Sequence, residues 1–306
     1  MLIKERILST YLMTFKQSLL TICLAMFALG AGAQGIPDTD IYLVSLKKSK
    51  ETVQVGTPAN ITQRSGYDNQ PSFTPDGKYV LFTSQRDGQQ TNIYQYSLAG
   101  KKTVQLTNTP EAEYSPLVTP DGKSFSVVRG KEQHLWRFPL TPGTGEPTLL
   151  MAMPQLIGYH VWYNQDSLFV AAFPDNPPMG MYLAVPSSKQ TMKLEESIGR
   201  SLHKVPGKQA VSYLVPVSDS VAEIKQLQVK TGERESLIQA LPGSQDYAWL
   251  PDGGLLMAQG AKLYLYRPGA ERRWKEVADF TRQGVKNITR LAVSPKGNFL
   301  SFVANP

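Results

Sequence analysis

The residues that could carry chemistry are few in this sequence of 306 amino acids. Its histidines are His134, His160 and His203. The Gly-x-Ser-x-Gly turn of serine hydrolases, the His-Glu-x-x-His zinc motif, the P-loop and the dinucleotide-binding glycine pattern do not occur. The remaining catalytic hypothesis is a metal-assisted hydrolase or lactonase, whose metal needs about three or four oxygen or nitrogen ligands. Glu113, His160 and Asp246 are the candidate ligands.

An internal repeat determines which of these residues can meet. The segments PSFTPDGKYVLFTS, from Pro71, and SPLVTPDGKSFSVVRG, from Ser115, are close copies, and four weaker copies follow. The turn proline or its equivalent recurs every 41–46 residues. These positions are Pro75, Pro120, Asn164, Val205, Pro251 and Pro295. A period of this length, filled with short strands, is typical of β-propeller blades.

Each copy has the pattern of four short strands. The first strand runs into a Pro-Asp-Gly turn, in which proline fixes φ and glycine accepts a positive φ, and an alternating strand follows. Two more strands come next, as in NIYQYSL and KTVQLT. We expect Asp76, Asp121 and Asp252 to accept hydrogen bonds from backbone N–H groups of these turns. We expect Trp162 and Trp249, which precede the turns, to pack in the core.

The two ends of the chain supply two halves of one blade. The segment IYLVSLKKSKETVQVG, from Ile41, has the pattern of an outer strand pair, and RLAVSPKGNFLSFVA, from Arg290, that of an inner pair. Pairing them closes a ring and removes the exposed strand edges of an open array. The sequence therefore predicts an all-β, six-bladed propeller with four antiparallel strands per blade and a last blade closed by both ends. A pair of β-sandwich domains is the alternative, which the regular period disfavours.

The repeat alignment places one set of polar residues at the mouth of the central channel. In a propeller, the loop that enters each innermost strand lies at one end of this channel, together with the first residues of the strand. The residues expected there are Glu113, Tyr159, His160, Arg200, Asp246, Tyr247 and Arg290, with Gln70 and Ser115 at equivalent positions. A concave opening of mixed polarity is the usual place for a ligand. Its two arginines favour an anionic or zwitterionic group.

Residues 1–33 have the pattern of a secretory signal peptide. Basic residues precede an apolar run over residues 19–30, and Ala31-Gly32-Ala33 fits the small-x-small cleavage pattern. The apolar run is short for a membrane span, which needs about 20 residues. We therefore expect cleavage near Gln34 and an exported protein.

The mature chain is expected to be a propeller over residues 34–306. The single cysteine, Cys23, lies in the segment that is removed, so disulfides and thiol chemistry are not expected. No later segment is apolar for long enough to cross a membrane. The net charge of +7 comes from dispersed basic residues, whereas a nucleic-acid-binding protein concentrates them in one stripe. We expect a monomer that binds no nucleic acid.

The Pro-Asp-Gly turn after a hydrophobic strand, at this period, resembles the WD40-like repeat of TolB-type propellers. The turn motif is strong at Asp76-Gly77, Asp121-Gly122 and Asp252-Gly253, and the resemblance covers residues 41–306. Similar propellers form the gating domain of prolyl-oligopeptidase-type peptidases. The resemblance extends neither to the α/β domain of TolB nor to the hydrolase domain of the peptidases. It implies a six-bladed propeller in the periplasm or another exported location.

Three functions fit these observations. The first is a non-enzymatic binding or scaffold propeller that engages a protein or peptide of the cell envelope at the channel mouth, without a cofactor. The second is the metal-assisted hydrolase or lactonase, with a divalent cation such as Ca²⁺ in the central tunnel. The third is a sensor of an envelope saccharide that stacks sugar rings on Trp or Tyr faces. Since the fold is shared by all three, the site must distinguish them.

Overall fold

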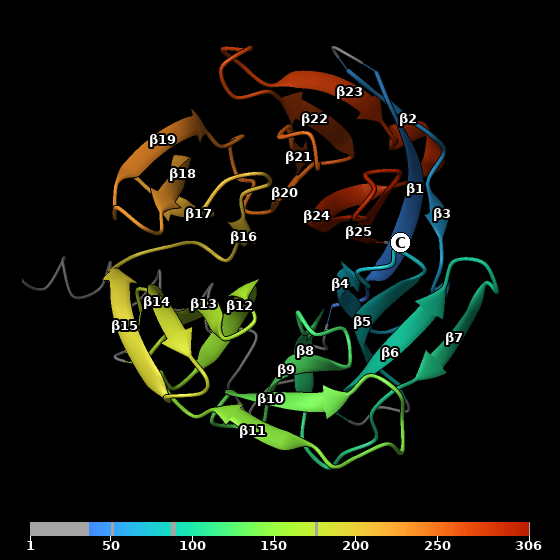
Figure 1. Cartoon of the computed structure of the whole chain (residues 1–306). Coiled ribbons are helices and arrows are strands. Elements are labelled where there is room, and N and C mark those ends of the chain that lie inside the picture. Colours follow the sequence, from blue (N-terminus) through green and yellow to red (C-terminus); the bar gives the residue numbers. More distant parts are fainter. Residues whose placement is uncertain (1–36, 50–51, 87–89, 175–176, 306) are drawn as a thin grey trace, which may run out of the picture. The chain divides into compact units, whose positions relative to one another are not determined.

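The chain forms a ring of six β-sheets that surround a central axis (Figure 1). The computed structural model describes residues 37–49, 52–86, 90–174 and 177–305. Residues 38–306 form one unit. The signal peptide expected over residues 1–33, with Cys23, lies outside the described residues. Among the described residues, no helix is both long enough and apolar enough to cross a membrane.

Each of the first five blades consists of four consecutive antiparallel strands, and the predicted six-bladed fold is confirmed. Blade 1 contains β4 (Asp68–Phe73), β5 (Tyr79–Gln85), β6 (Thr91–Ser97) and β7 (Lys102–Gln105). Blade 2 contains β8 (Glu113–Val118), β9 (Ser124–Arg129), β10 (His134–Pro139) and β11 (Thr148–Met151). Blade 3 contains β12 (Ile157–Asn164), β13 (Ser167–Ala172), β14 (Gly180–Val185) and β15 (Gln190–Glu195). Blade 4 contains β16 (Leu202–Lys204), β17 (Ala210–Pro216), β18 (Ala222–Gln228) and β19 (Arg234–Gln239). Blade 5 contains β20 (Tyr247–Trp249), β21 (Leu255–Gln259), β22 (Lys262–Tyr266) and β23 (Lys275–Asp279).

The sixth blade joins the two ends of the chain, as predicted. Its inner strands are β24 (Lys286–Val293) and β25 (Phe299–Asn305), and its outer strands are β1 (Asp40–Lys48) and β2 (Val53–Val55). The short β3 (Ala59–Asn60) also pairs with β1. Figure 1 shows β1 in blue beside the red β25. The remaining element is a 3₁₀ turn, η1 (Thr281–Gln283), between blades 5 and 6.

Hydrophobic side chains fill the spaces between neighbouring blades. The buried residues group into six clusters, and each cluster joins two adjacent sheets. Between blades 3 and 4, for example, Phe169 and Met181 pack with Val211 and Tyr213. Since both faces of every sheet are covered in this way, each blade depends on its neighbours for burial of its apolar side chains.

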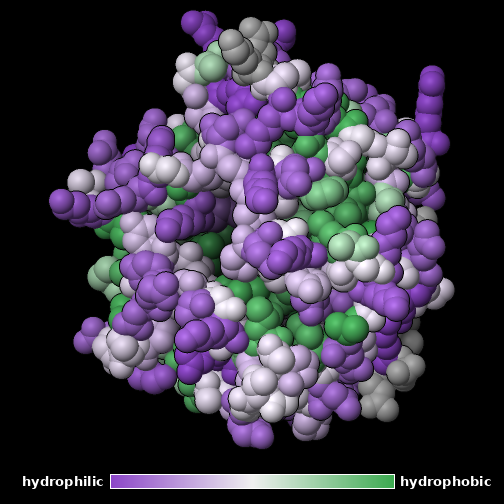
Figure 2. Space-filling view, turned by 45° about the vertical axis from the view of Figure 1, so that its right-hand side comes forward, coloured by the Kyte–Doolittle hydropathy of each residue, from purple (hydrophilic) through white to green (hydrophobic). Residues whose placement is uncertain are grey.

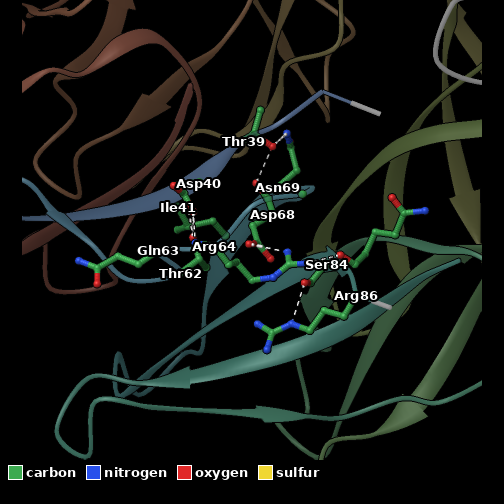
Figure 3. Close-up of polar contacts among 12 residues, drawn as sticks. Thr39, Asp40, Ile41, Thr62, Gln63, Arg64, Asp68, Asn69, Ser84 and Arg86 are labelled. Carbon is green, nitrogen blue, oxygen red and sulfur yellow. Dashed lines mark hydrogen bonds and ion pairs between the residues drawn. The ribbon is translucent and has the colours of Figure 1, made fainter. Parts of the chain in front are cut away.

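A polar cluster reinforces the junction of blades 6 and 1 (Figure 3). The Asp40 carboxylate accepts hydrogen bonds from Thr62 Oγ1 at 2.6 Å and Asn60 Nδ2 at 2.7 Å. Arg64 forms an ion pair with the buried Asp68, with Nη1 and Oδ2 3.0 Å apart, and donates from Nη2 to the Gln85 carbonyl. The segment that follows β3 is thereby bound both to β1 and to blade 1.

The aspartates of the Pro-Asp-Gly turns have a structural role, as predicted. Asp76 Oδ1 accepts from the Lys78 N–H at 3.0 Å and from Thr74 Oγ1 at 2.6 Å, and Asp121 makes the equivalent pair of bonds. Gly77 follows with φ of 69°, which the turn requires. The threonine hydroxyl stabilises the charged carboxylate and so lowers the pKa of Asp76.

Candidate ligand site at the channel mouth

A cavity of about 560 Å³ runs along the axis of the ring. Residues of the innermost strands of all six blades line it, together with the loops that enter these strands. The residues at the aligned position, one from each blade, are Gln70, Ser115, Tyr159, Arg200, Asp246 and Arg290. The repeat alignment thus identified a set of side chains that the structure brings to one channel.

Bulges within the inner strands direct some of these side chains. Gln70, Ser115 and Arg290 have φ of 54°, 54° and 52°, and in each case the pairing with the next strand shifts register at this point. A β-bulge re-aims the side chain that it carries. Gln70 Oε1 then accepts from the Ser115 N–H at 2.8 Å, which joins blade 1 to blade 2 at the channel wall.

Arg290 reaches across the channel. Its Nη2 donates to Tyr159 Oη at 3.1 Å, and its guanidinium carbon lies 5.0 Å from the centroid of the Tyr159 ring. Arg290 belongs to blade 6 and Tyr159 to blade 3, which stand opposite each other in a ring of six. The hydrogen bond and the cation–π contact between Arg290 and Tyr159 therefore join opposite sides of the channel.

Arg200 is bound to Asp246 on the neighbouring blade. Arg200 Nε donates to Asp246 Oδ1 at 2.9 Å and Nη2 to Oδ2, so the pair is bidentate. Burial opposes ionisation of Asp246, but the charges of Arg200 and Arg290 outweigh it and hold the pKa of this carboxyl below its usual value. The mouth therefore carries two guanidinium groups and one carboxylate, with a net positive charge.

His160, in blade 3, lines the channel, but its imidazole is buried against blade 2. Only 5% of its surface is exposed, and its Nε2 lies 2.7 Å from Ser126 Oγ. This contact has the form of a nucleophile and its base. Ser126 is fully buried, however, and His160 Nδ1 has no hydrogen-bond partner among the described residues, so no carboxylate orients the ring there. Burial lowers the pKa of His160 to about 3, which keeps the imidazole neutral.

An equivalent serine in blade 4 shows that this arrangement is structural. Ser212 Oγ accepts from Tyr247 Oη at 2.9 Å and from Trp249 Nε1 at 2.8 Å, as Ser126 accepts from Trp162 Nε1 at 2.9 Å. In both cases the serine belongs to the second strand of one blade and its partners to the first strand of the next. Tyr247, expected at the mouth, lines the channel, but its hydroxyl is buried and donates to Ser212.

Replacing Ser212 with alanine should lower the free energy of unfolding by about 2–3 kcal/mol, because two buried donors lose their acceptor. Urea denaturation measures this loss. The matched control is Ser72→Ala, which removes one hydrogen bond, from Ser72 Oγ to the Pro116 carbonyl, and should cost about 1 kcal/mol. Equal losses of unfolding free energy in the two variants would contradict the role of Ser212 as the shared acceptor of two hydrogen bonds.

Glu113 does not line the described channel, unlike the other residues expected at its mouth. Its side chain is fully buried in blade 2 and is absent from the described channel lining. Glu113 Oε1 accepts from Thr109 Oγ1 at 2.8 Å, while Oε2 has no hydrogen-bond partner within the described part of the chain. Burial raises the pKa of Glu113 to about 7, against the partly compensating charge of Arg129.

Glu113 should make the stability of the protein depend on pH near neutrality. Because its pKa is raised from 4.5 in the unfolded chain to about 7 in the folded one, the folded state binds the proton more tightly, and stability falls as the pH rises between these values. Glu113→Gln cannot ionise. Between pH 4.5 and pH 8 the unfolding free energy of this variant, relative to wild type, should rise by about 2–3 kcal/mol. A constant difference over that range would show that Glu113 is ionised in the folded protein.

Other candidate sites are weaker. Among the described residues, no group of three or more His, Asp, Glu or Cys side chains could hold a metal ion. The surface in Figure 2 is mainly hydrophilic, with hydrophobic side chains in a recess and in small patches. The large hydrophobic residues that are most exposed belong to several blades and are Val104, Met192, Val217, Met153, Leu149 and Leu156. Scattered residues of this kind are normal for a protein surface.

The comparisons with known proteins agree with this architecture. Residues 27–145 match the TolB β-propeller domain. The ring is similar to the structure assigned as TolB from Agrobacterium tumefaciens, with a TM-score of 0.67, 16% identity, and 89% of this chain and 100% of that chain covered. It is also similar to TolB from Acinetobacter baumannii, with a TM-score of 0.56, 15% identity, and 89% and 66% covered. The predicted TolB-like repeat is confirmed, and these structures show the fold.

Part of the sequence is also similar to a peptidase. The chain is 30% identical over 114 residues to dipeptidyl-peptidase 5 of Porphyromonas gingivalis, which is 35% of this chain and 16% of that protein. The chain spans at most 16% of the length of the curated relatives that it matches.

Proposed function

We propose that this TolB-like propeller is an exported, periplasmic binding protein that engages a protein or peptide of the cell envelope at its channel mouth. The observation that carries the proposal is the pair of guanidinium groups, Arg200 and Arg290, that converge from two blades with one carboxylate between them. Low-dielectric walls around such an opening focus its positive field on an entering group. A carboxylate of the partner is the complementary group.

Arg290 is the main contact in this proposal. Arg200 uses two of its side-chain nitrogens on Asp246, whereas the guanidinium of Arg290 donates from Nη2 to Tyr159. Its other N–H groups can pair with a carboxylate in the fork geometry that suits arginine. The hydrogen bonds among the lining residues fix the positions of the two cations before a ligand arrives, which reduces the entropic cost of binding.

The proposed location rests on residues 1–33, which have the signal-peptide pattern. N-terminal sequencing of the exported protein should find a chain that starts near Gln34. Retention of residues 19–30 in a membrane fraction would instead indicate an anchored protein.

Arg290→Met should reduce capture of the partner from envelope extract about tenfold to a hundredfold, since a hydrogen-bonded charge contributes about 1.5–3 kcal/mol. Immobilised wild-type and variant proteins are compared at equal loading, with thermal melting as the check on folding. The matched control is Arg282→Met, which removes the same charge from the exposed turn η1, directly before β24 in the sequence. If Arg290→Met captures the partner as well as Arg282→Met does, the channel mouth is not the binding site.

A further inference from the structure

A second cavity, of about 210 Å³, lies beside the channel at the junction of blades 5 and 6. Three segments line it: residues 242–246 before β20, residues 258–260 at the end of β21, and residues 287–289 at the start of β24. Arg200 and Asp246 line both this side pocket and the channel. The ion pair therefore borders both cavities, and a group bound at the arginines lies next to the side pocket.

The walls of the side pocket are held in place without a ligand. Gln259 Nε2 donates to the Pro242 carbonyl at 2.7 Å, and Ser244 Oγ donates to the Ala258 carbonyl. From blade 4, Ser201 Oγ donates to the Gln245 carbonyl at 2.8 Å. Two of these bonds join the loop over residues 242–246 to the end of β21, and the third joins it to blade 4. A pocket that is already formed costs little ordering entropy when it is filled.

The side pocket has room for one side chain, and its lining suits a polar one. A cavity of about 150 Å³ is known to admit a benzene ring, so 210 Å³ accommodates most side chains. Ala258 and Ile288 supply a small buried apolar surface, while Gln245, Asn287 and Thr289 supply polar side chains. A bound side chain would cover these polar groups, so the pocket favours a partner that returns their hydrogen bonds.

We propose that the channel mouth and the side pocket together bind the C-terminal residue of a peptide, with its α-carboxylate at the arginines and a short, uncharged polar side chain in the pocket. This inference rests on the proposed function. Because Arg200 and Asp246 line both cavities, the arrangement suits an α-carboxylate, since a C-terminal residue carries its side chain on the carbon next to that group. A carboxylate of an internal Asp or Glu has no such branch beside it.

Binding of the tripeptides Gly-Gly-Gly, Gly-Gly-Asn and Gly-Gly-Phe, with free or amidated C-termini, tests both proposals by calorimetry. The wild-type protein should bind free Gly-Gly-Asn about fivefold to tenfold more tightly than free Gly-Gly-Gly, which corresponds to one net hydrogen bond. Gly-Gly-Phe should gain nothing over Gly-Gly-Gly. Amidation should remove most of the binding of every peptide.

Two variants that fill the side pocket provide the second arm. Gln245→Phe changes an exposed residue that accepts the Ser201 hydrogen bond through its main-chain carbonyl, and Thr289→Phe fills the pocket from the β24 side. Both should abolish the preference for Asn and leave the affinity for Gly-Gly-Gly within about twofold of wild type. Gln190→Phe and Thr191→Phe, on the exposed outer strand β15, are the matched controls.

The outcomes separate the two proposals. Equal binding of free and amidated peptides would overturn the proposed function. Carboxylate-dependent binding with equal affinity for Gly-Gly-Asn and Gly-Gly-Gly, or with a preference for Gly-Gly-Phe, would overturn the side-pocket inference alone. Retention of the Asn preference in both filled variants would also overturn it.

Discussion

Deleting residues 34–57 should unfold the entire propeller rather than loosen one blade. The deletion removes β1, which pairs with β25 from Asp40–Ala304 to Ser45–Phe299 and stands between the inner strands and β2. Ile41 contributes to the cluster between blades 6 and 1, and Val44 and Leu46 to the cluster between blades 5 and 6. Loss of β1 therefore damages two blade junctions at once.

The expected size of this effect is comparable to the whole stability of a domain. Burial of Ile41, Val44, Leu46 and Val53 contributes roughly 6–12 kcal/mol at 1.5–3 kcal/mol for each side chain, and domains are stable by about 5–15 kcal/mol. The deletion also exposes the edge of β25, which invites aggregation. We expect no cooperative thermal transition. The control is a chain that starts at Asp38 and keeps β1; a 34–57 deletion that melts like this control would disprove the closure of the ring by β1.

The sequence was sufficient to predict the architecture because each blade repeats one local pattern. A single Pro-Asp-Gly turn determines little, but turns at Pro75, Pro120 and Pro251 with a regular period place equivalent strands in equivalent positions. The closure was also predictable, since the outer-strand pattern at Ile41 has no inner pair beside it in the sequence. Long-range pairing of β1 with β25 follows from that local incompleteness.

The candidate site was less predictable because the direction of a side chain depends on the register of its strand. Successive residues point to opposite faces of a sheet, and a shift of one residue reverses them. A register shift between Tyr114 and Leu117 separates Glu113 from the channel-lining Ser115. No glycine marks the positive φ of Ser115, so the sequence carries no local signal for this bulge.

The partners of the predicted residues were missed for a different reason. Ser126 and Ser212 lie in second strands, far in the sequence from the aromatic residues that they bind. The repeat offers one usable signal, since FSVV and VSYL place each of these serines as the third residue of its strand. The role of the serine depends on packing against the next blade, and a single sequence does not show which residues pack there.

The ion pair between Arg200 and Asp246 should be a major determinant of stability as well as part of the site. Asp246 has a side chain that is only 8% exposed, and it accepts two hydrogen bonds from Arg200. Arg200→Met leaves this carboxylate with Arg290 as the remaining nearby cation. Breaking a buried pair on one side costs about 3–5 kcal/mol, because the other charge remains buried without its partner.

The double variant Arg200→Met, Asp246→Leu distinguishes an unpaired charge from a loss of packing. Replacing both charges with apolar groups is often neutral, so urea denaturation should show that the double variant regains most of the stability lost in Arg200→Met. A double variant no more stable than Arg200→Met would assign the loss to packing of the arginine side chain.

Acid should have opposite effects on the stability of the wild-type protein and of Arg200→Met. In the wild-type protein the pKa of Asp246 is lowered, so its stabilising contribution is present above the unfolded value near 4 and is lost as the pH falls through the folded value. In Arg200→Met the burial of Asp246 dominates and raises its pKa, so protonation relieves the unpaired charge. The stability difference between wild type and Arg200→Met should therefore narrow from about 3–5 kcal/mol at pH 7 as the pH falls through the raised pKa of Asp246 in the variant, and it should go on narrowing below pH 4 until Asp246 is protonated in the wild type as well. A stability difference that is independent of pH would mean that Arg200 does not stabilise the charged form of Asp246.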